Sequence, residues 1–157
     1  MKIIYSCYGG AHSSRVAAAI HLGTLPLDRK PHPGELLAVP RFDDVSHDEM
    51  GHLDHLGKDS FGHDVYVLGR GGAGEVAVRA LVHGFELAGG TRSDLLFVDT
   101  LKAVNLPMRV GGFLSRRLGL VALGRPLVVY GTLRAYSHLT RLVRQTKEQT
   151  ARESDRA

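Results

Sequence analysis

The sequence has no tryptophan, a single cysteine and no long apolar run, and two of these absences exclude whole classes of protein. One thiol, Cys7, cannot form an internal disulfide, so a disulfide-built secreted domain is excluded and a cytoplasmic location is expected. No stretch of about 18 apolar residues occurs, which excludes a membrane-spanning helix and leads us to expect no membrane partner. The first residues also lack the apolar segment of a signal peptide.

Acidic residues are absent from Thr100 to Lys147, a segment that carries nine Lys and Arg residues, although the whole chain has a formal net charge of only +4. This segment predicts a positive face, which favours a phosphate, another anion or an acidic protein partner. A nucleic acid is disfavoured as partner, because base-stacking platforms interleave many aromatic residues with basic ones. The segment has only Phe113, Tyr130 and Tyr136.

The chain has 157 residues, of which 43% are hydrophobic and 23% charged, as in a globular protein. This length fits one domain, and we expect it to cover residues 1–147. The polar residues 148–157 are expected to form a frayed tail.

Four short segments have the nearly continuous apolar pattern of strands buried on both faces of a sheet. They are Lys2–Cys7, Asp64–Leu68, Leu95–Asp99 and Leu127–Tyr130. Helices are predicted at Ser13–Leu22, Gly74–Ala88, Gly112–Leu118 and Leu133–Glu148. The alternation predicts an α/β three-layer sandwich with a mainly parallel sheet of four or more strands, Rossmann-like or P-loop-like.

The segment between the first two predicted helices is irregular and rich in proline. It has room for a short helix that begins at Pro33 or Gly34, and the pair Ser46 and Glu49 forms a capping-box pattern for another. Residues 55–57 and Asp64–Leu68 flank a turn of Asp, Ser and Gly, which predicts a small hairpin insertion.

The strongest functional signal is the sequence CYGGAHSSR, between the first predicted strand and the first predicted helix. A helix N-terminus has unpaired N–H groups and a partial positive charge, and glycines let a ligand approach the backbone closely. Hydroxyl, imidazole and guanidinium groups follow the glycines and can bind or protonate a phosphate. The residues predicted to contact an anion here are Gly9, Gly10, His12, Ser13, Ser14 and Arg15. The alternative is an ordinary tight turn in which Ser13 only caps the helix.

This turn is not a Walker-type P-loop. That motif ends in Gly-Lys-Ser/Thr, and when Ser13 is aligned with its last residue, His12 replaces the lysine that neutralises the terminal phosphates. The spacing Cys7-x-x-Gly10-x-x-Ser13-Ser14 resembles instead the phosphocysteine loop of the IIB components of sugar phosphotransferase systems, which implies a nucleophilic thiolate at Cys7. The alternative for Cys7 is a small buried apolar residue at a strand end.

Two further turns are candidates for the same site. Gly69 to Gly74 fits G-x-G-x-x-G only superficially, since the acidic residues about 20 positions later flank the next strand, so we interpret it as a second anion contact through Arg70, Gly71 and Gly72. Asp99 ends a predicted strand, where it could hold Mg²⁺ or cap the next turn. Gly111 and Gly112 are predicted to start a helix beside Arg116, another candidate anion contact or a surface arginine.

Histidines cluster between the short helices and the hairpin. His47, His52, His55 and His63 lie among six aspartates, and both residue types are metal ligands. Their spacing does not converge on one helix face, so solvated loop histidines are the favoured interpretation and a metal site is the alternative.

Several longer stretches, taken together, resemble a known family. They are IIYSCYGGAHSSRVAAAIHLG, LLAVPRFDDVSHDEMGHLDHLGKDSFGHDVYVLGRG, VGGFLSRRLG and LVVYGT, spread over residues 2–147. In combination they are similar to the domain of unknown function 3189, a family of mainly spore-forming Firmicutes. The resemblance implies no particular activity, but it favours the Gly9-Gly10-x-His12-Ser13 core over Cys7 as the family's typical feature.

The function that the sequence favours is binding of a phosphorylated small molecule or nucleotide at the glycine-rich turn. Phosphoryl transfer or hydrolysis could follow, with His12 as the catalytic residue. One alternative is a non-catalytic regulatory protein whose basic C-terminal face docks an acidic protein. The third is phosphotransfer through Cys7.

Overall fold

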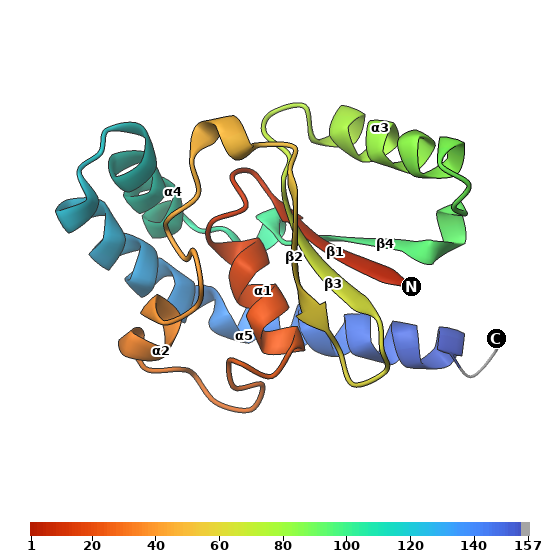
Figure 1. Cartoon of the computed structure of the whole chain (residues 1–157). Coiled ribbons are helices and arrows are strands. Elements are labelled where there is room, and N and C mark those ends of the chain that lie inside the picture. Colours follow the sequence, from red (N-terminus) through yellow and green to blue (C-terminus); the bar gives the residue numbers. More distant parts are fainter. Residues whose placement is uncertain (155–157) are drawn as a thin grey trace.

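Four strands form one open, mostly parallel sheet in a computed structural model of the chain, which describes residues 1–154 (Figure 1). The strands are β1 (Lys2–Cys7), β2 (Leu53–Lys58), β3 (Asp64–Gly69) and β4 (Leu95–Asp99). Their order is β2-β3-β1-β4, with β1 parallel to both β3 and β4 and β2 antiparallel to β3. The mixed α/β class and the hairpin are confirmed.

Helices lie on both faces of this sheet. The helices are α1 (Ser13–His21), α2 (Pro33–Leu37), α3 (Gly74–Leu87), α4 (Leu106–Gly112) and α5 (Val121–Ser154), and α4 continues into a π-helical segment at Phe113–Arg117. Three 3₁₀ turns occupy His47–Glu49, Arg92–Asp94 and Leu101–Ala103. Figure 1 shows α1, α2 and α5 on one face of the sheet and α3 on the other.

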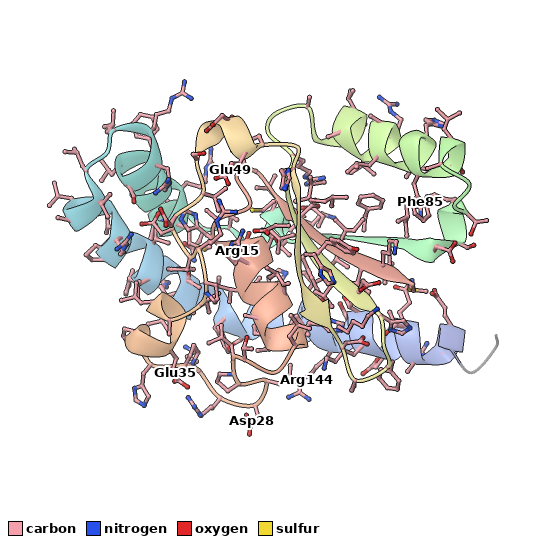
Figure 2. The ribbon with its side chains drawn as sticks, viewed as in Figure 1. Arg15, Asp28, Glu35, Glu49, Phe85 and Arg144 are labelled. Carbon is pink, nitrogen blue, oxygen red and sulfur yellow. The ribbon has the colours of Figure 1, made fainter. Side chains whose placement is uncertain are left out.

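The core is divided by the sheet because successive residues of a strand point to opposite faces. Ile3 and Tyr5 of β1 face the larger cluster, which includes Val16 of α1 and Leu139 of α5. Ile4 faces the smaller cluster, which α3 covers with partly buried side chains such as Phe85 (Figure 2). No residue of α3 is fully buried, so this helix covers its face loosely.

The predicted strand Leu127–Tyr130 is wrong, because these residues lie inside α5. A four-residue apolar run cannot by itself distinguish a strand from a turn of buried helix. Glycines flank this run inside α5, and Gly124 and Gly131 are points where α4 and its π-helical continuation approach the α5 backbone. Gly111 and Gly112 likewise lie at the end of α4 and do not start a helix.

The last described residues belong to a helix. α5 continues past residue 147 to Ser154, and Thr146 and Thr150 are buried on one face of its last turns. The polar composition concealed this face, because a small Thr side chain can pack where its hydroxyl bonds to the helix backbone, as Thr146 does to the carbonyl of Leu142. Residues 155–157 of the predicted tail lie outside the described residues. Within residues 1–154 no helix is both long and apolar enough to cross a membrane.

A buried polar network ties the β2–β3 hairpin to α1. The His21 ring bonds to the Tyr5 hydroxyl at 2.7 Å through Nδ1 and to Asp59 at 3.1 Å through Nε2. Asp59 also accepts from the His63 backbone N–H and ring. Burial opposes ionisation of Asp59, but these donors outweigh it and lower its pKa to about 2, while burial lowers the pKa of His21.

We expect this network to make folding sensitive to acid. Below pH 6.5 the unfolded state protonates His21 more readily than the folded state does, and between about pH 4 and pH 2 the same holds for Asp59, so stability falls as pH falls. Asp59→Asn should cost about 2 kcal/mol at pH 7 and flatten the decline below pH 4. Urea unfolding across pH measures this, with exposed Asp28→Asn as control. An unchanged pH profile in Asp59→Asn would contradict the assignment.

Candidate functional site

Two glycine-rich turns pack against each other at the carboxyl ends of β1 and β3. The N–H groups of Arg70 and Gly71 donate to the carbonyls of Cys7 and Tyr8, at 3.0 and 2.9 Å. A Cβ atom at Gly69 would lie 2.8 Å from the carbonyl carbon of Gly9, so a larger residue cannot stand there. The glycines at this contact therefore hold the two turns together.

A cavity of about 790 Å³ opens beside the first turn. It lies between this turn, residues 45–50 and the α4 segment, by which we mean α4 together with its π-helical continuation (residues 106–117). Its lining residues are Cys7, Tyr8, Gly9, Ala11, His12, Ser13, Val45, Ser46, Met50, Leu101, Val104, Met108, Arg109, Gly112, Phe113, Arg116 and Arg117. None of these described residues is Asp or Glu, and three are arginines. The cavity thus combines positive charge with an apolar wall from Leu101, Val104, Met108 and Phe113, which suits an anionic ligand with an apolar part.

The three arginines differ in how far the protein already uses them. Arg116 donates from Nη1 to the Asp43 carbonyl at 2.8 Å, and its buried Nε has no hydrogen-bond partner within the described residues. Arg109 and Arg117 are exposed, and neither side chain forms an ion pair or hydrogen bond within residues 1–154. Their guanidinium groups are therefore available to a ligand.

His12 is held by a carboxylate from a distant loop. Its Nε2 lies 3.0 Å from Oδ1 of Asp43, and its ring packs edge-on against Phe42. Asp43 is fully buried and has a positive φ of 54°, a conformation that Asp tolerates better than most residues. The loop thus turns the carboxylate toward the His12 ring.

Three side chains meet at the Asp43 carboxylate. Ser115 Oγ donates to Oδ2 at 2.6 Å, and Arg125 Nε donates to the same atom at 3.2 Å. Burial opposes ionisation, but the bonds from His12 and Ser115, the charge of His12 and the bond from Arg125 outweigh it, and the pKa of Asp43 lies below its usual value. Asp43 therefore joins the glycine turn, the π-helical segment and α5 through one negative charge.

The N-terminus of α1 has no side-chain cap. Its first intrahelical bond runs from the Val16 N–H to the His12 carbonyl, which leaves the preceding N–H groups of the first turn for another acceptor. Ser13 does not cap the helix, the alternative that the sequence left open, because its hydroxyl bonds to Thr100 at 3.0 Å. An uncapped helix N-terminus beside a positive cavity favours anion binding.

Cys7 and Ser14 lie behind this turn. Cys7 Sγ is 3.0 Å from the Ser14 hydroxyl and accepts from the Gly10 N–H at 3.2 Å. Cys7 is buried but lines the cavity, whereas Gly10 and Ser14 do not line it.

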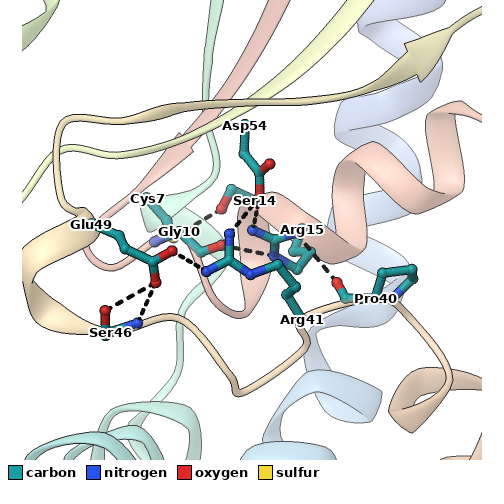
Figure 3. Close-up of polar contacts among 9 residues, drawn as sticks. All are labelled: Cys7, Gly10, Ser14, Arg15, Pro40, Arg41, Ser46, Glu49 and Asp54. Carbon is teal, nitrogen blue, oxygen red and sulfur yellow. Dashed lines mark hydrogen bonds and ion pairs between the residues drawn. The ribbon is translucent and has the colours of Figure 1, made fainter.

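Arg15 serves the scaffold rather than the cavity. The residue is 1% exposed, and its guanidinium donates to the Gly10 carbonyl, the Pro40 carbonyl and the Asp54 carboxylate, the last at 2.6 Å (Figure 3). All three guanidinium nitrogens donate a hydrogen bond within the protein, and Arg15 is not among the residues that line the cavity. We therefore do not include Arg15 among the anion contacts.

Asp54, the partner of Arg15, also takes part in the ion pairs that hold residues 45–50, which form one wall of the cavity. Arg41 pairs with both Asp54 and Glu49, and Glu49 accepts from the Ser46 N–H at 2.7 Å as the capping pattern predicts (Figure 3). These ion pairs fix residues 45–50 beside the glycine turn.

The second glycine turn does not reach the cavity. Arg70, Gly71 and Gly72 are absent from its lining, and Arg70 forms an ion pair with Asp99 at 2.7 Å. Asp99 also accepts from the Leu101 N–H at 2.8 Å, so it caps the next turn, which is the alternative that the sequence left open. The second turn therefore contacts the first turn through the backbone and does not line the cavity.

The described side chains of the histidine cluster do not come together at one point. Within the described residues no group of three or more His, Cys, Asp or Glu side chains could hold a metal ion. His55 pairs with Asp64 at 3.1 Å and His63 with Asp59 at 3.1 Å. The side chain of His47 lies outside the described part of the structure.

Sequence reasoning missed three residues of the site. Arg109 and Arg117 belong to the acid-free segment that predicted a positive face. The helix was predicted to begin at Gly112, so Arg109 lay outside it and Arg117 inside it, and nothing indicated that the two arginines share a site. Asp43 was considered only as a metal ligand in an irregular loop, and nothing in its sequence neighbours indicates a contact with His12.

Fold and site together define a mixed α/β protein with a positively charged cavity at the carboxyl edge of its sheet. The chain belongs to the family described as protein of unknown function (DUF3189), whose model matches residues 2–148. No curated protein and no solved structure matches it.

Proposed function

We propose that this protein binds a phosphorylated small molecule or a nucleotide in the cavity beside the β1–α1 turn. The observation that carries the proposal is an uncapped helix N-terminus at a cavity with three arginines and no carboxylate among its described lining residues. Backbone N–H groups and guanidinium groups are the donors that phosphates prefer in proteins.

The shape of the cavity supports a ligand with two chemically different ends. A volume of about 790 Å³ lies in the range of small-molecule sites. The anionic end would lie between the glycine turn and the three arginines of the lining, and the organic part would contact Met108 and Phe113. The strand–turn–helix order is the one by which Rossmann-like and P-loop-like proteins bind phosphate, with arginines of the α4 segment in place of the P-loop lysine.

Removal of the two free arginines should weaken binding without unfolding the protein. In Arg109→Gln/Arg117→Gln we expect phosphate affinity to fall by at least about tenfold, because each charge-assisted hydrogen bond contributes about 1.5–3 kcal/mol. Thermal shift with inorganic phosphate, sugar phosphates and nucleotides, with and without Mg²⁺, measures the loss. Arg134→Gln is the matched control, since Arg134 is basic and exposed on α5 but outside the cavity lining. Equal shifts in all three proteins would contradict the proposal.

A second candidate function, docking of an acidic protein, is favoured by a different surface. The exposed apolar residues of α4 and the first half of α5 lie at helical spacing in the acid-free segment: Leu106, Val110, Leu123, Leu127 and Tyr130. Arginines flank them, and Arg134 lies over the Tyr130 ring. A complex that survives Arg109→Gln/Arg117→Gln but is lost in Leu123→Glu would support docking over ligand binding.

A further inference from the structure

The hydrogen bonds of Asp43 determine which nitrogen of His12 carries the proton. Asp43 is ionised at neutral pH, as its lowered pKa indicates, and an ionised carboxylate only accepts hydrogen bonds. Its contact with His12 Nε2 at 3.0 Å therefore requires a proton on Nε2. In the neutral ring the other nitrogen, Nδ1, then has a free lone pair and is the nucleophilic atom.

The Nδ1 edge of the ring faces the cavity wall at Gly112. A Cβ atom at Gly112 would lie 3.0 Å from His12 Cε1 and 3.5 Å from Nδ1, and both residues line the cavity. Within residues 1–154, Nδ1 has no hydrogen-bond partner. A side chain at Gly112 would contact this edge of the ring, so glycine at this position keeps Nδ1 uncovered by a side chain from residue 112.

We propose that His12 Nδ1 accepts a phosphoryl group from a phosphoric anhydride bound in the cavity, a step that rests on the proposed function. Nδ1 attacks phosphorus, the N–P bond forms, and the bond from phosphorus to the bridging oxygen breaks. The bridging oxygen leaves with the electron pair as a carboxylate or a phosphate. The imidazole becomes cationic and retains its proton on Nε2. The ionised Asp43 carboxylate compensates the positive charge.

The cavity selects an anhydride over an alcohol ester because of the proton that each leaving group needs. An alkoxide must be protonated as it leaves, and the described lining has no carboxyl group that could act as the acid. A carboxylate or phosphate leaves as a stable anion and needs only positive charge, which Arg109, Arg116 and Arg117 supply. Acyl phosphates and nucleoside triphosphates share this chemistry.

The competing nucleophile in the cavity is Cys7. Cys7 is buried, and its sulfur is engaged with the Ser14 hydroxyl and the Gly10 N–H. His12 has only one nitrogen engaged, and its side chain is 16% exposed. His12 is therefore the more accessible nucleophile.

The test labels the full-length protein with ³²P-acetyl phosphate in one arm and γ-³²P-ATP with Mg²⁺ in the other. We expect an acid-labile, alkali-stable label that peptide mapping places on His12, and the arm that labels identifies the anhydride. His12→Gln should reduce labelling at least about tenfold, while His83→Gln, on exposed α3, should label like the wild type.

Asp43→Asn tests the positioning role, because an amide can donate to Nε2 and move the proton to Nδ1. We expect labelling to fall about tenfold or more while phosphate still shifts the melting temperature. Should this variant not fold, the ring ¹⁵N shifts of His12 in the wild type test the same role: a protonated Nε2 with an unprotonated Nδ1 is expected, and the opposite tautomer would overturn it.

Three results would overturn the inference. A label on Cys7 that Cys7→Ala removes would establish the thiol as acceptor, and a label that survives in His12→Gln would exclude His12. Binding of imidodiphosphate in thermal shift, without labelling by either donor, would leave the proposed binding function standing and exclude phosphoryl transfer. Absence of both binding and labelling would overturn the two proposals together.

Discussion

Replacement of Asp43 by alanine should lower the free energy of unfolding by about 3–5 kcal/mol, because it removes a buried carboxylate from its contacts with the largely buried His12 and Ser115 side chains. The carboxylate is fully buried and bonded to His12, Ser115 and Arg125. Alanine would remove the acceptor for all three donors, and the positive φ of 54° would add strain for a residue with no polar side chain to stabilise it.

Urea unfolding by circular dichroism measures this loss, and Asp44→Ala provides the control. Asp44 is the next residue and is exposed, and within residues 1–154 its carboxylate forms one ion pair, with Arg116 at 3.9 Å, so its loss should change stability by less than about 0.5 kcal/mol. Similar losses in the two variants would contradict the central position of Asp43 in the site.

The second large effect is expected at Gly124, where α5 crosses the end of α4. A Cβ atom there would lie 2.4 Å from the Ser115 backbone nitrogen and 2.5 Å from the Gly111 carbonyl oxygen. Both are backbone atoms, which cannot rotate away, so Gly124→Ala must separate the two helices. We expect a loss of about 2–3 kcal/mol from overpacking and a weaker response to phosphate, since the α4 segment forms the arginine wall of the cavity.

Gly84→Ala is the matched control for this prediction. Gly84 also lies inside a helix, α3, but a Cβ atom there has nothing within 4 Å. The same substitution should stabilise the protein by about 0.5–1 kcal/mol, because alanine favours the helix and meets no neighbour. Thermal melts of both variants distinguish the effect of packing from the effect of helix propensity. A higher melting temperature in both variants would contradict the close crossing of α4 and α5.

Local patterns predicted the elements whose signals are contained in a few neighbouring residues. The ranges of α1 and α3 agree within one residue, since glycines end both patterns. The run at Leu127–Tyr130 failed because its helical state depends on contacts with α4, about 20 residues earlier in the chain. Length and flanking residues alone favoured a strand, and tertiary packing decided the outcome.

In the site, too, the residues that neighbour one another in the sequence were predicted, and those that only the fold brings together were not. The glycine turn and its place at the sheet edge follow from a strand, a glycine pair and a helix in immediate succession, and the structure places His12 and Ser13 at the cavity. The second turn was expected to contribute Arg70, but the nearby Asp99 binds that guanidinium. Asp43 and the α4 arginines come from distant loops and helices, so only the folded chain brings them to His12.

The central claim, that the cavity at the β1–α1 turn binds phosphate, is tested most directly by a ¹H–¹⁵N NMR titration with inorganic phosphate and tripolyphosphate. The account predicts saturable shifts of the backbone N–H groups of Gly9, His12 and Ser13 and of the Arg109 and Arg117 side chains, all lost in Arg109→Gln/Arg117→Gln. Shifts confined to the outer surface of α5 around Arg134 and Arg141, with the turn unchanged, would contradict it.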